Sequence, residues 1–255
     1  MTKMIRVAAA ALGIAAAWGQ ALAQADPLES ARWEDMKKTF FPDARVEFDS
    51  RVRVSAPAIA ENPLNVPVHV DASALGRVEE VMVFADFNPI VKALSFTPVA
   101  ALPNLAFRLK LQQSTPVRAA ARTADGVWHL GGAWVNTTGG GCTLPSTGSA
   151  SPVWQQRLNE VSARRWPATP QGGERLRLSI IHPMDTGLSA GIPNFHIEDL
   201  RLTAGGRELM RIRPLEPVAE NPLFTIDMPA GEQLKRIHVS GRDNNGNTID
   251  SWVDQ

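Results

Sequence analysis

Short runs in which every second residue is apolar, separated by proline or glycine, recur along most of this 255-residue chain. Val66, Val68 and Val70 form one such run, and Val81 and Val83 belong to the next. A period of two is typical of half-buried β-strands, because successive side chains point to opposite faces. The chain also contains 19 prolines, which interrupt long helices. The sequence therefore predicts a mainly β protein of the sandwich type. The predicted strands lie at 46–54, 66–70, 81–85, 106–111, 117–121, 127–135, 176–181, 195–202, 208–212, 223–228, 234–240 and 248–253.

Two short helices are predicted beside the strands. One follows Asp26 and Pro27 and covers 28–40, because an acidic residue before proline is a common helix start. The other begins at Ser151 and Pro152, and its apolar residues Trp154, Leu158 and Val161 repeat at helical spacing before Trp166.

The second helix lies in a segment rich in Gly, Ser, Thr and Pro that divides the chain. We predict one sandwich with an N-terminal helix at 24–136, a cysteine-bearing arm and linker at 137–173, and a second sandwich at 174–255. The pentapeptide Ala-Glu-Asn-Pro-Leu occurs at 60–64 and again at 219–223, once in each half. Two related sandwiches would explain the repetition. Coincidence would also explain it, since the alternation of apolar and polar residues after the two copies is out of phase by one residue.

The first 23 residues have the pattern of a secretory signal peptide. Lys3 and Arg6 precede an apolar run at 7–18, and Ala21-Leu22-Ala23 suits cleavage before Gln24. The run is shorter than the roughly 20 residues that span a bilayer. We therefore expect a mature protein exported to the periplasm, with no membrane span.

The charge balance excludes some partners. Lys and Arg number 26, as do Asp and Glu, so no basic stripe for nucleic acid is expected. The pair Arg164-Arg165 is interpreted as a solvated helix face.

Cys142 is the single cysteine, and it follows Gly139, Gly140 and Gly141 in a stretch without charged residues. A single thiol cannot form an intramolecular disulfide, and glycines allow a mobile backbone. The alternative is a buried cysteine that acts as a small hydrophobic residue, but this needs apolar flanks, and the flanks here are Gly, Thr and Asn. The sequence therefore favours an accessible thiol on a flexible arm. No Asp, Glu, Lys or Arg lies between Asp125 and Arg157, so we expect a pKa near the ordinary value of about 8.5. This favours a passive attachment site over a nucleophilic catalyst, which needs an adjacent base.

Other constellations are weaker. His182 and His196 with Asp185 and Glu198 match no metal-ligand spacing, so no metal site and no cofactor are predicted. A Cys-His pairing that forms only in the fold stays open, but no catalytic residue is assigned.

The chain resembles two families that act together. The first half is similar to SoxY, the thiol-bearing subunit of the sulfur-oxidation carrier, and the second half is similar to its companion SoxZ. The SoxY resemblance rests on Ile59-Ala60-Glu61-Asn62, Val66-Pro67-Val68, Phe87-Asn88-Pro89, Arg108-Leu109-Lys110-Leu111, Asp125-Gly126 and Gly139-Gly140-Gly141-Cys142. The SoxZ resemblance rests on His182-Pro183-Met184-Asp185-Thr186-Gly187, Asn221-Pro222-Leu223 and Asp243-Asn244-Asn245-Gly246. Both subunits in one polypeptide match the fused SoxYZ-like carriers associated with quinoprotein dehydrogenases.

The resemblance implies two immunoglobulin-like sandwiches that pack together and a carrier without catalytic machinery. Cys142 would hold a sulfur intermediate, Gly139 to Gly141 would form the arm, and the role of the 182–187 motif stays open. The implied partners are sulfur-oxidation enzymes of the periplasm or a quinoprotein dehydrogenase.

The chain departs from SoxY in one respect, because Thr143-Leu144-Pro145 and a further domain follow the cysteine. An arm tethered at both ends reaches less far than a free tail. Two alternatives remain, a thiol-dependent enzyme or redox protein and a structural accessory of a quinoprotein dehydrogenase.

Overall fold

A computed structural model describes residues 25–147, 152–166, 173–229 and 234–254. The predicted signal peptide at 1–23 lies outside these residues. The helical elements are α1 (Trp33–Phe40), η1 (Ser73–Leu75) and α2 (Pro152–Arg157). The strands of the first half are β1 (Val46–Phe48), β2 (Arg53–Ser55), β3 (Ile59–Ala60), β4 (Val66–Asp71), β5 (Val78–Ala85), β6 (Lys92–Pro98), β7 (Asn104–Leu109), β8 (Thr115–Thr123) and β9 (Trp128–Thr137). Those of the second half are β10 (Val161–Trp166), β11 (Arg175–Ile180), β12 (Asp185–Thr186), β13 (Asn194–Phe195), β14 (Ile197–Ala204), β15 (Arg207–Pro214), β16 (Leu223–Asp227), β17 (Arg236–Asp243) and β18 (Thr248–Asp254).

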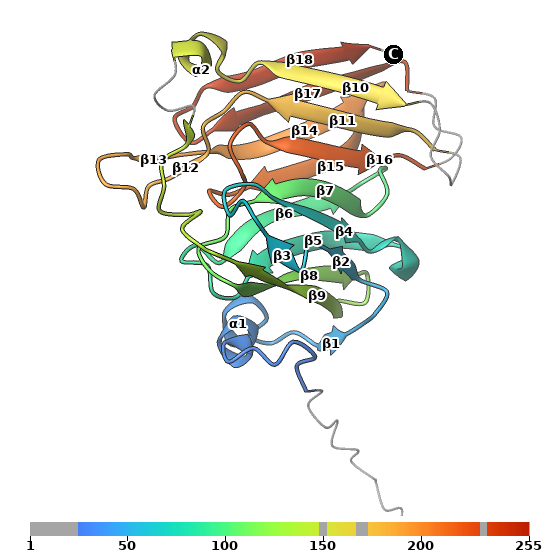
Figure 1. The fold of residues 1–255 in the computed structure, drawn as a ribbon. Helices are drawn as coiled ribbons and strands as arrows, with labels where there is room; N and C mark the ends of the chain where they lie inside the picture. The colour runs from blue at the N-terminus through green and yellow to red at the C-terminus, as the bar shows by residue number, and fades with distance from the viewer. Residues whose placement is uncertain (1–24, 148–151, 167–172, 230–233, 255) are drawn as a thin grey trace, which may run out of the picture.

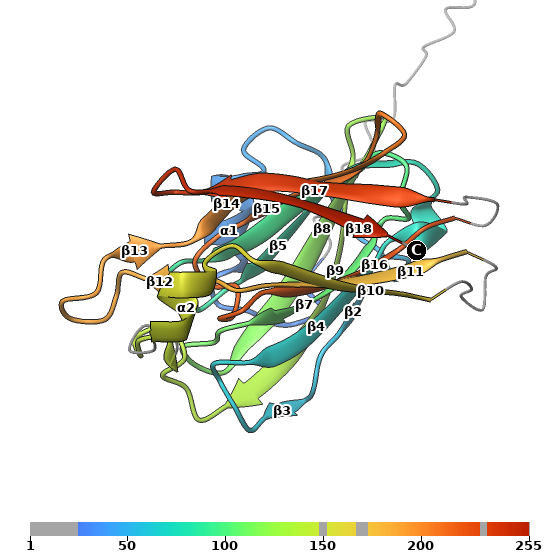
Figure 2. The same ribbon diagram turned by 90° about the horizontal axis from the view of Figure 1, so that it is seen from above.

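Two large sheets face each other, so the prediction of a mainly β sandwich protein is confirmed (Figures 1 and 2). The ten-stranded sheet has the order β1-β9-β8-β5-β6-β15-β14-β17-β18, with β3 paired to β9. The six-stranded sheet has the order β10-β11-β16-β7-β4-β2. The strands β12 and β13 form a small separate sheet.

Each large sheet runs without a break from the first half of the chain into the second. In the ten-stranded sheet, β6 pairs antiparallel with β15, so that Phe96 lies opposite Ile212. In the six-stranded sheet, Ala106 of β7 lies opposite Thr225 of β16. We call these two junctions the seam. Because each half supplies the strand that covers the other's edge, neither leaves its unpaired backbone groups exposed there.

The two halves repeat the same topology on either side of the seam. Outward from it, the ten-stranded sheet runs β6-β5-β8-β9 in one direction and β15-β14-β17-β18 in the other. The six-stranded sheet runs β7-β4-β2 and β16-β11-β10. The repeated pentapeptide does not follow this symmetry. Residues 60–64 precede β4, whereas 219–223 lead into β16, which is the counterpart of β7. The pentapeptide is therefore no sign of the internal repeat.

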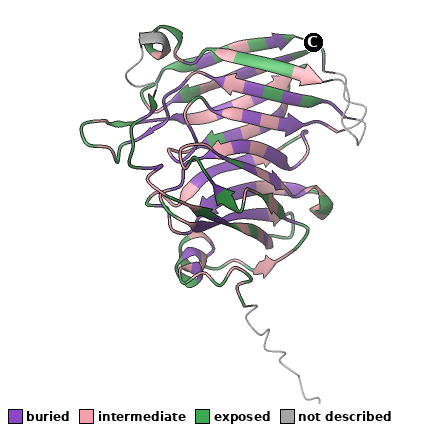
Figure 3. Ribbon diagram, in the orientation of Figure 1, coloured by how far each residue is buried: buried purple, intermediate pink, exposed green. Residues whose placement is uncertain are grey.

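A single hydrophobic core fills the space between the sheets and contains residues of both halves, such as Leu94, Leu109, Leu178 and Ile212. The alternation of buried and more exposed residues along β4 and β11 reflects this one-sided burial (Figure 3). A smaller cluster lies on the outer side of the ten-stranded sheet. There Trp33 and Met36 of α1 and nearby Phe41 cover Met82, Phe84, Ala120 and Leu130.

Three sequence predictions about elements need correction. The first helix begins at Trp33 and not at Leu28, because the Asp26 carboxylate accepts hydrogen bonds from the backbone N–H groups of Leu28 and Ser30 in a turn. The second helix ends at Arg157, and Val161–Trp166 is a strand paired with β11 inside the segment predicted as a linker. The predicted N-cap Ser151 lies outside the described residues.

The Arg164-Arg165 pair therefore lies on a strand and not on a helix face. Arg165 forms a largely buried ion pair with Glu174, whereas Arg164 lies opposite Arg177 of β11.

Arg118 of β8 ties the N-terminal segment to the ten-stranded sheet. Its guanidinium is almost fully buried and lies 2.7 Å from the Asp26 carboxylate and 3.0 Å from that of Asp86. It also lies over the Trp33 ring at 4.9 Å. Burial alone would raise the pKa of Asp26, but the hydrogen bonds from Arg118 and from backbone N–H groups outweigh it and lower the pKa.

Replacing Arg118 with methionine should lower the free energy of unfolding by about 3–5 kcal/mol, because it leaves two carboxylates without their cation. Urea denaturation at pH 7 measures the change. The matched control is Arg122→Met on the same strand, whose half-exposed ion pairs with Glu79 and Glu80 should contribute less than about 1 kcal/mol. Equal losses in the two variants would contradict the anchoring role.

Candidate functional site

Cys142 lies in a segment that leaves the end of β9 and crosses the seam toward α2. We call residues 138–147 the strap. Its first part is held by the first half of the chain, where the N–H groups of Gly140 and Gly141 donate to the carbonyl oxygens of Gln112 and Leu111. The N–H group of Cys142 donates to the Gln112 side-chain oxygen at 3.2 Å. Up to Cys142, the strap is therefore bound to the first half of the chain.

The second part of the strap is held by the second half. The hydroxyl of Thr186 donates to the Cys142 carbonyl oxygen at 2.6 Å, and the N–H group of Ser146 donates to the Asp185 carboxylate at 3.0 Å. The N–H and hydroxyl groups of Thr147 both donate to the Glu220 carboxylate, at 2.8 and 2.7 Å. Cys142 is therefore the residue at which the two halves meet across the strap.

The thiol is fully buried, so the prediction of an exposed sulfur is wrong for this conformation. In the described part of the chain, Sγ makes one hydrogen bond, a weak one to the carbonyl oxygen of Lys110 at 3.6 Å. The polar sequence neighbours of Cys142 gave no sign of burial, because the groups that cover it come from distant parts of the chain.

The glycines before Cys142 serve close packing in this structure and not mobility. A Cβ on Gly141 would lie 2.2 Å from the carbonyl oxygen of Pro63, and one on Gly139 would lie 2.5 Å from that of Gln112. Gly139 and Gly140 also have φ angles of 85° and 90°, a region that side chains rarely allow. Without these glycines the strap could not lie against the 110–112 segment.

Lys110 is a buried cation beside the thiol. Its Nζ donates to the carbonyl oxygens of Met184 and Glu216, the latter at 3.2 Å. Burial lowers the pKa of Lys110 to about 8, although the charges of Cys142, Asp185, Glu220 and Glu216 oppose the shift.

The thiol is unreactive in this environment. Burial raises the pKa of Cys142 to about 11, and the nearby Lys110 charge only partly offsets the effect. At pH 7 the two groups are thus a thiol and an ammonium, and only about one molecule in ten thousand carries a thiolate. The prediction of an ordinary pKa for the thiol is therefore wrong, because it assumed an exposed sulfur and the sulfur is buried.

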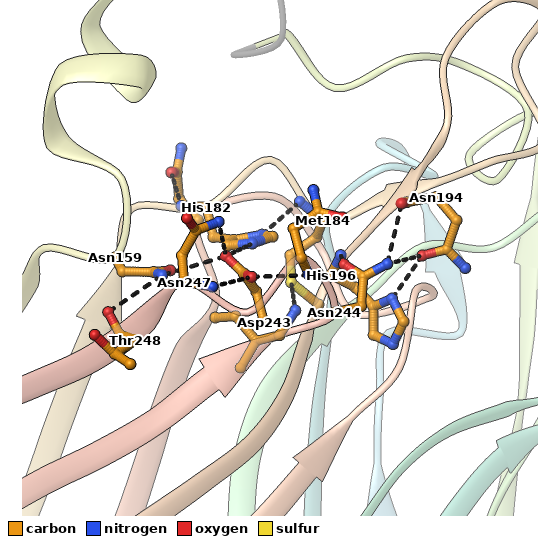
Figure 4. Close-up of polar contacts among 12 residues, drawn as sticks. Asn159, His182, Met184, Asn194, His196, Asp243, Asn244, Asn247 and Thr248 are labelled. Atoms are coloured by element: carbon orange, nitrogen blue, oxygen red, sulfur yellow. Dashed lines mark hydrogen bonds and ion pairs between the residues drawn. The ribbon is translucent and has the colours of Figure 1, made fainter.

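The His182–Gly187 motif borders this site on the side of the second half, where Thr186 contacts the Cys142 carbonyl oxygen and Met184 contacts Lys110. Figure 4 shows His182 and Met184 of this motif among their polar neighbours. Nδ1 of the fully buried His182 accepts a hydrogen bond from the Met184 N–H group at 3.0 Å. Met184 has a φ angle of 53° and turns its carbonyl oxygen to Lys110, while its sulfur accepts from the Ile197 N–H group. His182 thus fixes the turn that binds Lys110.

The remaining motif residues support the same loop. Pro183 lies between His182 and Met184. The strand formed by Asp185 and Thr186 pairs with β13, and the side chains of both residues form the hydrogen bonds to the strap described above. A Cβ on Gly187, which has a φ angle of 75°, would lie 3.0 Å from Asn194.

The histidines weighed as metal ligands have other contacts. Nε2 of His182 lies 3.7 Å from the Asp243 carboxylate, and burial lowers the pKa of His182 to about 4, against the opposing charge of Asp243. Nδ1 of His196 lies 2.7 Å from the Asn194 side-chain oxygen. Glu198 forms an ion pair with Arg242. Among the described residues no group of three or more His, Cys, Asp or Glu side chains is arranged to hold a metal ion.

Three residues of the site were not predicted from the sequence, namely Lys110, Gln112 and Glu220. Lys110 follows Leu109, the last residue of β7, and the alternation of that strand would direct it to the outer face. Its side chain turns inward because the strand has ended. A charged residue between Leu109 and Leu111 was the available signal.

The thiol should react slowly and gain reactivity only at high pH. Because its pKa is raised to about 11, the thiolate fraction rises about tenfold per pH unit from pH 7 to 10. Alkylation of the native protein by iodoacetamide, followed by intact mass, should show this rise and a rate at pH 7 at least 100-fold below that in 8 M urea. A rate that is already maximal near pH 8 would contradict the burial of the thiol.

Comparisons with known proteins match a different family to each half of the chain. Residues 36–142 match the model of the family "Sulfur oxidation protein SoxY", and residues 165–253 match that of "Sulphur oxidation protein SoxZ". The SoxY match ends at Cys142. No curated protein matches the chain. None of the helices in the described ranges is long and apolar enough to cross a bilayer.

Solved structures give weaker likenesses. The sulfur carrier protein SoxY from Chlorobium limicola f thiosulfatophilum is 20% identical over 42% of this chain and 96% of its own, with a TM-score of 0.36. A putative membrane anchored protein from Corynebacterium diphtheriae is 11% identical over 80% of this chain and 57% of its own, with a TM-score of 0.27. From the two family matches in tandem, the chain is a fused SoxYZ-like protein, with a SoxY-family domain followed by a SoxZ-family domain.

Proposed function

We propose that the protein is a non-enzymatic carrier in sulfur oxidation that holds a sulfur-containing group covalently on Cys142. The descriptions of both matched families support a role in sulfur oxidation, and the SoxY match ends at this cysteine. The chain has a single thiol, so the attachment site is Cys142. We further propose that the protein works in the periplasm after removal of residues 1–23, with a quinoprotein dehydrogenase among its partners.

The observation that carries the proposal is the strap. The thiol lies on a segment outside the two large sheets, and mainly hydrogen bonds hold it to both halves. Each such bond contributes about 1 kcal/mol net. Opening the strap would leave the two sheets intact, because their pairing does not involve residues 138–147. The described conformation is then a closed, resting state of the carrier.

Loading requires an open strap and a partner. Joining an incoming thiol-level sulfur to Sγ breaks the S–H bond of Cys142, whose thiolate is the reacting form. The step forms an S–S bond with release of protons to solvent and of two electrons to an oxidising partner. In the closed site Cys142 is a protonated thiol at pH 7, because burial raises its pKa to about 11. The partner enzyme therefore receives the open strap, lowers the thiol pKa and takes the electrons. In this account Gly139 to Gly141 act as the arm only after undocking.

Protein isolated from the periplasm of its natural host should carry a mass adduct on Cys142. Intact-mass analysis with and without a reductant measures it, and the reductant should remove the adduct because the bond is S–S. The control is Cys142→Ser from the same host, which should keep the fold and show no added mass. An adduct that persists in this variant, or a bare thiol under sulfur-oxidising growth, would contradict the carrier role.

Weakening the strap should expose the thiol without unfolding the protein. Thr186→Val removes the hydrogen bond to the Cys142 carbonyl oxygen and should speed alkylation at pH 7 roughly fivefold, as expected for a loss of about 1 kcal/mol. Glu220→Ala removes both bonds to Thr147 and should have a larger effect. Thr203→Val on β14 is the matched control and should leave the rate unchanged. Unchanged rates in both Thr186→Val and Glu220→Ala would show that the thiol is not released by strap opening.

A further inference from the structure

The outer face of the six-stranded sheet is hollowed across the seam. The hollow measures about 560 Å³, within the range of small-molecule sites. Its floor is a row of residues in register on four adjacent strands, Arg177 opposite Thr225, Thr225 opposite Ala106, and Ala106 opposite His69. Ala106 and Thr225 are short, and this makes the face concave.

The walls of the hollow are apolar and cationic. The lining residues include the apolar Pro57, Pro67 and Leu223 and the two arginines Arg108 and Arg177. Among the described residues, no Asp or Glu lines the hollow. The hollow therefore combines a hydrophobic surface with two positively charged side chains.

The arginines of this region have no carboxylate partner among the residues that the structure describes. Arg164 of β10 lies directly opposite Arg177 of β11. Two like charges at directly opposed positions of paired strands repel each other. Within the described ranges, neither Arg108, Arg164 nor Arg177 forms an ion pair with a carboxylate. Arg108 reaches only the side-chain oxygen of Asn65, at 3.5 Å.

At the other end of the same face, the arginines are paired with carboxylates. There Arg53 pairs with Asp71, and Arg175 pairs with Asp227 at 2.7 Å. Asn104 adds a hydrogen bond to the same Asp227 carboxylate. Arg53 and Arg175 are thus paired with carboxylates of neighbouring strands, whereas Arg108 and Arg177 at the hollow have no such pair among the described residues.

We propose that the hollow binds a small organic anion, a carboxylate or sulfonate with an apolar body. The planar guanidinium groups of Arg108 and Arg177 match the two or three oxygens of such a group. Pro57, Pro67 and Leu223 would cover the apolar body. This site is separate from Cys142, so it does not depend on the carrier role.

Isothermal titration calorimetry of the mature chain at pH 7 tests the proposal with four probes. Octanoate and octanesulfonate should bind, whereas octylammonium, which lacks the negative charge, and acetate, which lacks the apolar body, should bind at least tenfold more weakly. Equal binding of octanoate and octylammonium, or no binding of octanoate at millimolar concentration, would overturn the proposal.

Three variants locate the site. Arg177→Gln and Arg108→Gln should each weaken octanoate binding about tenfold, since each removes a charged hydrogen-bond donor. Ala106→Leu should fill the floor and abolish binding. Arg53→Gln, on the same face but paired with Asp71, is the matched control and should change the affinity less than twofold. Circular dichroism checks that each variant is folded. Folded Arg177→Gln and Ala106→Leu proteins that bind octanoate like the parent would also overturn the proposal.

Discussion

The pairing of β6 with β15 and of β7 with β16 is the constraint on which the rest of the structure depends. It joins the two halves into continuous sheets and gives them one core. It also brings the 110–112 segment of the first half beside the 182–187 loop of the second. Lys110 extends across this junction to the Met184 carbonyl oxygen, and Thr186 reaches back to the Cys142 carbonyl oxygen. The thiol site exists only because the seam holds these segments together.

Burial would protect the thiol of the proposed carrier. In the periplasm, where we propose that the protein works, an unpaired cysteine is prone to unwanted oxidation, and susceptibility follows thiolate character and exposure. Burial raises the pKa of Cys142 to about 11 and removes both conditions. We infer that the fused chain uses the strap as a cover. The second anchor of the strap, at Asp185 and Glu220, lies in the SoxZ-family half, and Glu220 belongs to the loop before β16.

The sequence predicted the strands better than it predicted the site. Strands with one buried face, such as β4 and β11, show the period of two and were found. Strand β6 was missed because Ala93 to Phe96 are all buried and show no alternation, although this strand forms one of the two seam junctions with β15. Residues 161–166 were assigned to a helix because Trp154, Leu158 and Val161 imitate helical spacing. The burial of Cys142 had no local signal, because Lys110, Gln112 and Thr186 approach it only through tertiary contacts.

Hydrogen–deuterium exchange of the strap in the free-thiol and sulfur-loaded forms tests the central claim most directly. The N–H groups of Gly140, Gly141, Cys142, Ser146 and Thr147 are all hydrogen-bonded in the closed state. The account predicts that they are protected in the thiol form and exchange much faster when Cys142 is loaded, with no change in β6 or β15. Equal protection of the strap in both forms would contradict a carrier that must open to accept its load.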